Sequence, residues 1–438
     1  MRKCALFVLL AAFILVGIGQ AIAQNGRAVL QLQVEGPVTP AMAEYFARGI
    51  RAAEADGATA VIIELDTPGG AIDTTQEIVQ TFRAATVPVI VYVAPRGAQA
   101  ASAGSIITMA AHAAAMAPET VIGAASPVGQ DGAELDTTLF RKVTEDLKAQ
   151  VRSLAARRGP EAVALAEAMI SDARAVHAEE ALDAGLIDVI ASDVPDLLRQ
   201  LDGRTVIVND QPVILHTAAA ETRPFLMNVV EVILHALSNP VLVSILLAIG
   251  VQAILIEISH PGGWVAGFVG VVFLALALYG LGQLPANWFG LGLILVAFVL
   301  FLLEVKAPVH GALAVTGVVT MFAGFMVLFN SPGTPAFARL SMISAVLITL
   351  PTAAFFIFLV FMVLRAQRRK PITGEQGLIG QKGTVRQAIA TQPGVDYYAG
   401  MVQVQGELWR AAAHDRIDEG EEVEVTAVQG FTLQVKRV

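Results

Sequence analysis

The chain has 438 residues, of which 55% are hydrophobic and only 15% charged, and its formal net charge is -9 at pH 7. This composition is too apolar for a protein that is soluble throughout, so part of the chain is expected to lie in a membrane. The net negative charge argues against a nucleic-acid partner, and the single cysteine, Cys4, excludes an internal disulfide or a cysteine metal cluster.

The N-terminus has the three parts of a secretory signal peptide. It begins MRK, continues through an apolar run from Ala5 to Gly17, and ends in the small residues AIA at Ala23. We therefore predict a signal peptide at residues 1–23, with an uncleaved N-terminal anchor as the alternative. In either case the domain that follows is expected outside the cytoplasm.

Residues 24–222 are predicted to form an α/β domain. Apolar strand-like runs alternate with helical ones: AVLQLQVEG, TPAMAEYFARGIRAAEA, TAVIIELDTPGG, AIDTTQEIVQTFRAA and PVIVYVAPRG. This order, with continuous apolar strands, indicates a parallel sheet covered by helices. Ligand sites in such sheets lie beyond the carboxyl ends of the strands, where the loops DTPGG and RGAQAASAG are rich in glycine and small residues.

Residues 223–370 are predicted to form a transmembrane region of about five helices. Each long apolar run is near the roughly 20 residues that a bilayer requires; the runs cover about 240–258, 263–281, 286–304, 311–329 and 342–364. The basic cluster RAQRRK follows the last run and is expected in the cytoplasm. Before the first run, PFLMNVVEVILHAL fits a helix along the membrane surface or a plain linker helix equally well.

Residues 371–438 are predicted to form a small antiparallel barrel. Alternating runs such as GMVQVQ, EEVEVTAV and TLQVKRV are separated by turns that contain glycine. Between residues 377 and 438, six Lys and Arg stand against eight Asp and Glu, so electrostatics favour protein docking over nucleic-acid binding.

Ser102 is the candidate nucleophile of the α/β domain. It follows a strand and a loop and opens a predicted helix, whose free N–H groups favour a developing anion. The small residues Ala101, Ala103 and Gly104 around it leave room for a substrate backbone. A serine at a helix start is more often just an N-cap, and the local sequence alone favours that role.

A serine nucleophile requires a base, and the histidines do not supply one. His112 lies ten residues along the same predicted helix, which is about 15 Å at the helical rise per residue. His177 and His216 have no supporting pattern. A Ser-His-Asp triad is therefore not indicated.

Lysine can serve as the base when burial favours its neutral amine. Residues 24–217 contain only two lysines, Lys142 and Lys148. A helical wheel puts Lys142 nearly opposite the apolar stripe and Lys148 on its flank, which is typical of solvated residues. A helix that begins near residue 142 would instead let Lys142 project into a neighbouring cleft. The residues alone leave open whether Lys142 is a catalytic base or an ordinary solvated lysine.

The loop DTPGG is the candidate oxyanion hole. Its glycines, Gly69 and Gly70, can present backbone N–H groups to an oxyanion with no side chain in the way. The alternative is a tight turn that leads into the next helix.

Three segments, in this order, resemble the ClpP-class membrane serine proteases of the NfeD family: LDTPGGAIDTT, AASAGSIITMAAHAAAMAPETVIGAASPVG and FRKVTEDLKAQVRSLAARRG. The five-span core and the final GQKGTV, GELWRA and IDEGEEVEVTAVQGFTLQV resemble the family's membrane region and OB-type barrel. The resemblance implies that Ser102 is the nucleophile, Lys142 the base of a Ser-Lys dyad, Gly69 and Gly70 the oxyanion segment, and Asp172 a carboxylate that orients the lysine. Asp172 is equally compatible with an ordinary capping or surface role.

One feature departs from the family pattern. The family carries a more apolar or proline-containing lead into the lysine, whereas Leu139, Phe140 and Arg141 precede Lys142 here. Arg141 would either favour the neutral amine by charge repulsion or mark a displaced register.

The resulting hypothesis has a ClpP/crotonase-like α/β domain outside the cytoplasm, five transmembrane helices and a cytoplasmic OB-type barrel. The protein is predicted to be a serine endopeptidase that needs no metal or cofactor, because the chain has no P-loop, HExxH or cysteine pair. The resemblance implies polypeptide substrates with apolar segments and a membrane partner of the stomatin, prohibitin or flotillin type. A homodimer or larger ring is also expected.

Two alternatives come from other classes of protein. The first is a non-proteolytic membrane scaffold that organises a stomatin- or flotillin-like partner. The second is acyl-CoA chemistry of the crotonase type, which the export signal and the lack of an acid/base carboxylate beside either glycine loop disfavour.

Overall fold

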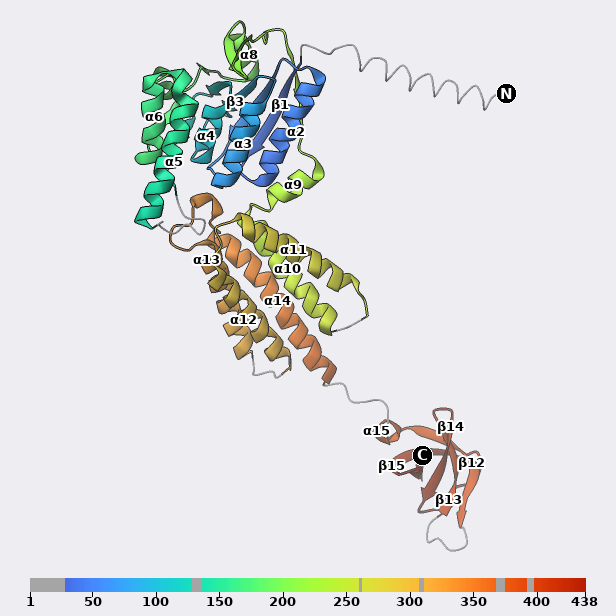
Figure 1. Cartoon of the computed structure of the whole chain (residues 1–438). Helices are drawn as coiled ribbons and strands as arrows, with labels where there is room; N and C mark the ends of the chain where they lie inside the picture. The colour runs from blue at the N-terminus through green and yellow to red at the C-terminus, as the bar shows by residue number, and fades with distance from the viewer. Residues whose placement is uncertain (1–27, 128–135, 260–261, 307–310, 368–374, 392–397) are drawn as a thin grey trace, which may run out of the picture. The chain divides into compact units, whose positions relative to one another are not determined.

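The computed structural model describes residues 28–127, 136–259, 262–306, 311–367, 375–391 and 398–438 (Figure 1). The predicted signal peptide at residues 1–23 lies outside these ranges. The chain divides into two compact units, Met1–Phe356 and Ile357–Val438.

The α/β part of the first unit is built on a six-stranded sheet in the order β11-β1-β2-β3-β5-β8, in which every pairing is parallel. Its strands are β1 (Ala28–Glu35), β2 (Ala60–Asp66), β3 (Val89–Val93), β5 (Ala113–Met116), β8 (Val189–Ile190) and β11 (Glu221–Pro224). On β2, Val61 and Ile63 join one core and Ala60 and Ile62 join the other. Both faces are buried along β3 and β5 and along most of β2, which explains why these strands are mainly apolar and confirms the predicted parallel sheet.

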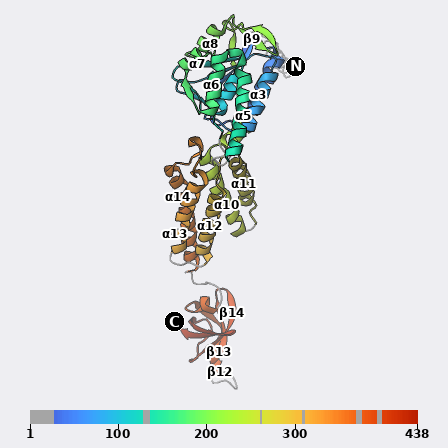
Figure 2. The same cartoon turned by 60° about the vertical axis from the view of Figure 1, so that its left-hand side comes forward.

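Helices cover both faces of this sheet (Figure 1). One core is formed with α2 (Pro40–Asp56), α3 (Ile72–Ala84), α4 (Ala103–Ala110), α5 (Thr137–Ala155), α6 (Pro160–Ser171) and α7 (Ala178–Asp183). The other is formed with α8 (Val194–Leu201) and the hairpin β9 (Thr205–Val208) and β10 (Gln211–Ile214). Figure 2 shows α5 and α6 side by side. A smaller sheet consists of β4 (Gln99–Ala101), β6 (Val121–Gly123) and β7 (Ala175–His177).

The bounds of α2 illustrate how the sequence sets these elements. Thr39 caps the helix by accepting a hydrogen bond from the N–H of Met42, and Pro40 occupies the first helical position, where a missing N–H has no cost. Gly57 ends the helix in the left-handed conformation, at φ 63°. These signals set the two ends of α2, which contacts β1, and the chain then returns through β2 toward the loop that carries Gly69.

Five apolar helices follow the short helix α9 (Val229–Ala236). They are α10 (Pro240–Ser259), α11 (Val265–Gln283), α12 (Trp288–Lys306), α13 (Ala312–Phe329) and α14 (Met342–Gln367). Within the described residues, four stretches are long and apolar enough to cross a membrane: Pro240–Ile258, Val265–Gln283, Ala312–Phe329 and Ala336–Leu359.

Four of the five expected spans correspond to these stretches, and the fifth corresponds to a shorter apolar stretch within the described residues, Trp288–Glu304 of α12. The side chain of Asn287 accepts a hydrogen bond from the N–H of Phe289, so α12 begins at Trp288, two residues later than expected.

A glutamate closes each of the two helical hairpins in this region. The carboxylate of Glu257 in α10 accepts from the N–H groups of Trp264 at 3.1 Å and Gly267 at 3.2 Å. Glu304 in α12 accepts from Gly311 at 2.9 Å and from Leu313 at 3.0 Å. Each negative charge thus meets the positive end of the following helix, which stabilises the turn.

The second unit contains a closed five-stranded barrel in the order β12-β13-β14-β16-β15. Its elements are α15 (Glu375–Leu378), β12 (Lys382–Thr391), β13 (Tyr398–Val404), β14 (Glu407–Ala413), β15 (Glu422–Gln429) and β16 (Thr432–Arg437). The predicted barrel is confirmed, but β14 and β16 pair in parallel and not antiparallel. β15 lies between β14 and β16 in the chain and runs in the opposite direction to both. β14 and β16 therefore run in the same direction where they pair.

Candidate functional site

The loop after β2 and the short strand β4 meet beyond the carboxyl end of β2. The N–H of Thr67 donates to the carbonyl of Gln99 at 2.7 Å, and the N–H of Ala101 donates to the carbonyl of Thr67 at 3.0 Å. These two bonds hold the loop DTPGG against the segment that leads into Ser102. The tertiary structure thereby joins the two glycine-rich loops singled out in the sequence.

Ser102 precedes α4 but does not cap it. Its backbone has φ 52° and ψ -117°, and its side chain makes no capping hydrogen bond. The backbone N–H of Ser102 donates instead to the carbonyl of Gly123 on β6, at 2.7 Å. A positive φ at a residue other than glycine is strained and is held by its surroundings. Among the described residues, no hydrogen bond engages the Ser102 hydroxyl, so it is available to a ligand.

Gly69 packs directly against Ser102. Its φ of +111° suits glycine, and a Cβ at this position would lie 2.6 Å from the Ser102 Cβ. The carbonyl of Gly69 accepts from the N–H of Val38 at 2.8 Å, which fixes the loop to the connection between β1 and α2. Only a residue without a side chain fits beside the serine.

The N–H groups of the two glycines differ in their partners. The N–H of Gly69 donates to the Oγ1 of Thr67 at 3.1 Å. Gly70 is exposed, and its N–H has no partner among the described residues. The first N–H groups of α4 also lack partners within the helix. Backbone donors therefore come from the loop of Gly70 and from the start of α4, and the N–H of Gly70 is free of partners among the described residues.

Sequence reasoning missed the contribution of Thr67 and Val38. Thr67 is fully buried, and its hydroxyl and backbone hold Gly69 and the strand before Ser102. Val38 comes from the connection between two other elements. The threonine is visible in DTPGG, but its partners are set only when the two loops lie side by side.

Lys142 lies in the second turn of α5 and is exposed. Asp136 caps this helix by accepting from the N–H groups of Thr138 and Leu139, so the helix begins at Thr137. The alternative in which the helix begins near residue 142 is therefore wrong. No hydrogen bond or ion pair of Lys142 occurs within the described part of the chain, and residues 128–135, which precede α5, lie outside it.

Lys148 and Asp172 have ordinary local partners. The amine of Lys148 lies 3.7 Å from the carboxylate of Glu145 on the same helix. Asp172 is exposed at the end of α6, where the hydroxyl of Ser171 donates to it at 3.1 Å. Neither contact links these residues to Ser102, and no hydrogen bond or ion pair between described residues joins Asp172 to a lysine.

His112 is a buried structural residue. Its Nδ1 accepts a hydrogen bond from the N–H of Val89 at 3.0 Å, which ties the end of α4 to β3. Burial, together with the positive charges of Arg157 and Arg83, lowers the pKa of His112 to about 4 from 6.5. The imidazole is thus neutral at pH 7.

The depressed pKa of His112 predicts an acid-sensitive fold. The unfolded chain takes up a proton below about pH 6.5 and the folded chain only near pH 4, so the stability present above pH 6.5 falls by about 3 kcal/mol as the pH falls to 4. Thermal unfolding of the α/β domain in the full-length protein between pH 7 and pH 4 measures this loss. In His112→Asn, an amide oxygen replaces the Nδ1 acceptor, and a slope as steep as that of the wild type would contradict the assignment.

Three family models match the chain. They are described as "NfeD1b, N-terminal domain" at residues 28–204, "NfeD integral membrane domain" at residues 241–362, and "NfeD-like C-terminal, partner-binding domain" at residues 375–437. The membrane-bound protease PH1510 of Pyrococcus horikoshii is 35% identical over 442 residues, which cover 98% of each chain.

Two solved structures are similar to the α/β part of the chain. One is a serine-to-alanine mutant of the 1510-N membrane-bound stomatin-specific protease, with 37% identity, a TM-score of 0.43, and coverage of 46% of this chain and 99% of that chain. The other is a lysine-to-alanine mutant of the same protease in complex with a substrate peptide, with 36% identity, a TM-score of 0.45, and coverage of 48% and 97%.

Proposed function

This chain belongs to the NfeD family of integral membrane proteins, and on that premise we propose that it is a membrane-bound serine endopeptidase with a Ser-Lys dyad. The relative that matches over nearly the whole of both chains is a membrane-bound protease. The proposal places the reaction at Ser102 and the loop of Gly69 and Gly70.

The conformation of Ser102 is the observation that carries this proposal. A serine that served only as an N-cap would turn its side chain to the N–H groups of α4, and Ser102 does not. It is held instead at a positive φ, directly against a glycine that admits no side chain. Strain of this kind is retained where it positions a reacting group.

The proposed reaction uses Ser102, Lys142 and backbone N–H groups. Lys142, as the neutral amine, takes the hydroxyl proton while the Ser102 oxygen bonds to the peptide carbonyl carbon. The negative charge on the carbonyl oxygen is met by backbone N–H groups, of which that of Gly70 is free. The leaving amine receives the proton from Lys142, and water then releases the acyl group. A bound peptide would cover Lys142, which is exposed in the free protein, and exclude water from its amine.

The substrate and partner follow from the family. We propose that the protease cleaves apolar segments of membrane-associated proteins of the stomatin, prohibitin or flotillin type. The C-terminal barrel matches a partner-binding domain, which supports a role in holding such a partner. We propose that the α/β domain lies outside the cytoplasm and the barrel inside, because the basic cluster RAQRRK follows the last apolar run in the sequence. We also propose a homo-oligomer.

The test uses the full-length protein in lipid nanodiscs, with a quenched fluorescent peptide that carries an apolar segment, and with or without a purified stomatin-like protein. A fluorophosphonate probe, which loses fluoride to a reactive serine, is applied in parallel. We expect hydrolysis of the peptide and a phosphonyl label that mass spectrometry locates on Ser102. Absence of both, with the partner present, would favour the non-proteolytic scaffold.

A further inference from the structure

The helix α9 is inverted relative to an ordinary surface helix. Glu231 is its buried residue, at 4% exposure, and His235, one turn later, is half-buried. The apolar residues of α9 and of the segment before it face outward, with exposed fractions of 46% to 76%: Leu226, Val229, Val230, Val232 and Ile233. A helix in water places such residues against the core, so this apolar face requires a different explanation.

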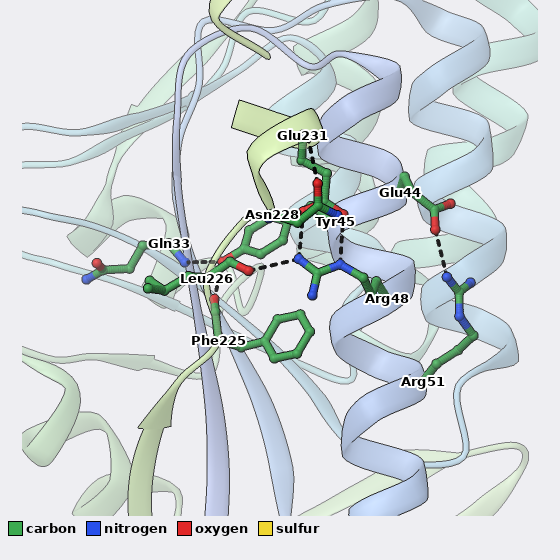
Figure 3. Close-up of polar contacts among 9 residues, drawn as sticks. All are labelled: Gln33, Glu44, Tyr45, Arg48, Arg51, Phe225, Leu226, Asn228 and Glu231. Carbon is green, nitrogen blue, oxygen red and sulfur yellow. Dashed lines mark hydrogen bonds and ion pairs between the residues drawn. The ribbon is translucent and has the colours of Figure 1, made fainter. Parts of the chain in front are cut away.

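An ion pair holds the polar side of α9 to the α/β domain. The Nε of Arg48, on α2, lies 2.8 Å from one carboxylate oxygen of Glu231, and an Nη of Arg48 lies 2.6 Å from the other (Figure 3). The same guanidinium donates to the carbonyl of Leu226 at 2.8 Å. Burial opposes the charge of Glu231, but hydrogen bonds from Arg48 and the Asn228 backbone keep the pKa of this carboxyl below its usual range.

Two aromatic rings complete this attachment. The guanidinium of Arg48 lies 4.3 Å from the centre of the Phe225 ring, and the ring of Tyr45 stacks on Phe225 with 6.2 Å between their centres. The hydroxyl of Tyr45 donates to the carbonyl of Phe225 at 2.5 Å. Figure 3 shows these residues converging from α2 and the segment before α9. The contacts fix the segment that leads into α9 and therefore the direction of the apolar face.

His235 anchors the far end of the helix. Its Nε2 donates to the carbonyl of Glu35 at 2.9 Å, and its Nδ1 lies 3.2 Å from the hydroxyl of Thr39. Glu231 and His235 are four residues apart and so lie on one side of the helix. Rotation of α9 to bury its valines would break the contacts that Glu231 and His235 make with the α/β domain.

Chain continuity identifies what covers the apolar face. Only residues 237–239 separate the end of α9 from Pro240, where the first membrane-spanning helix begins. Four residue steps reach at most about 14 Å, so α9 cannot lie far from the end of that span. We propose that α9 lies in the membrane surface, with its face from Leu226 to Ile233 in the boundary between lipid headgroups and acyl chains.

The proposal does not depend on proteolysis, and spin labels test it in the full-length protein. A nitroxide is attached to Val230→Cys, and in a second protein to Ile214→Cys, both in a Cys4→Ser background in nanodiscs. Val230 and Ile214 are matched by exposure, at 63% and 55%, but Ile214 lies on β10. We expect the Val230 label to be relaxed by lipid-soluble oxygen and shielded from a water-soluble nickel complex, and the Ile214 label to behave oppositely.

Two results would overturn the proposal. Equal access of the nickel complex to both labels would place the face of α9 in water. Shielding of the Val230 label from both oxygen and nickel would mean that protein, and not lipid, covers it.

The attachment is tested with the same label. Arg48→Met removes the guanidinium from Glu231 and is expected to increase the mobility of the Val230 nitroxide and its access to nickel. Arg51→Met is the matched control, because Arg51 lies one turn later on α2 and pairs with Glu44 at the surface, where both side chains are about 60% exposed (Figure 3). An unchanged spectrum in Arg48→Met, or the same change in both variants, would contradict the role of the ion pair.

Discussion

Replacement of Ser102 by alanine is expected to abolish peptide hydrolysis and to leave the fold intact. The hydroxyl makes no hydrogen bond to any described residue, so its loss removes no structural contact. Loss of a serine nucleophile lowers kcat by about 10⁴-fold or more. The measurement compares kcat/KM of wild type and Ser102→Ala as full-length proteins in nanodiscs, with thermal unfolding as the check on folding. Retained activity in a folded Ser102→Ala protein would contradict the protease mechanism.

The two lysines of the α/β domain provide a matched pair for the base of this dyad. Both lie on α5, but Lys148 is paired with Glu145 whereas Lys142 has no partner among the described residues. Lys142→Ala is expected to lose activity nearly as completely as Ser102→Ala, since the two groups act as one unit. Lys148→Ala is expected to retain it. Loss of activity in Lys148→Ala but not in Lys142→Ala would assign the base to Lys148, with Ser102 still the nucleophile.

Replacement of Gly69 by alanine is expected to cause a large loss of activity that is smaller than the losses in Ser102→Ala and Lys142→Ala. The new Cβ would lie 2.6 Å from the Cβ of Ser102, which is closer than van der Waals contact allows, so either the serine or the loop must move. Displacement of an oxyanion donor costs about 10²- to 10³-fold in kcat. Steady-state hydrolysis should show this loss in kcat, with the binding of a peptide to the inactive enzyme less affected.

Gly159→Ala is the control for the effect of backbone conformation. Gly159 has a φ of +109°, nearly that of Gly69, but a Cβ there meets nothing within 4 Å. Both variants therefore place alanine at a similar unfavourable φ, and only Gly69→Ala carries the collision with Ser102. Equal loss of activity in the two variants would attribute the effect to stability and not to the position of the serine.

The sequence was sufficient to predict those parts of the fold that depend on a local pattern of residues. The resemblance to the NfeD family is confirmed by a relative that matches over nearly the whole chain. The run that forms β3 is continuously apolar, and the run that forms β2 is apolar up to Ile63, because both faces of a parallel sheet are buried; this pattern predicts that sheet without further information. The apolar stretches near 20 residues and the alternating runs of the barrel are equally local signals.

The site was only partly predictable, because its geometry depends on residues far apart in the chain. The position of Ser102 at a helix start predicts an N-cap, and only the structure shows that its side chain makes no capping hydrogen bond while its backbone N–H donates to Gly123. The role of Lys142 stays a prediction, because the observed start of α5 at Thr137 leaves the lysine exposed. Asp172 likewise stays a prediction that rests on the family resemblance.

The sequence by itself therefore determined the α/β domain, the apolar helices, the barrel and the family, since each depends on periodicity or on a motif. The tertiary structure alone decided that DTPGG lies against Ser102, that β14 pairs in parallel with β16, and that α9 turns its valines outward. Each of these depends on contacts between segments separated by tens of residues or more in the chain, as when Arg48 on α2 binds Glu231 on α9. No local pattern encodes such a pairing, because its energy exists only after both segments are in place.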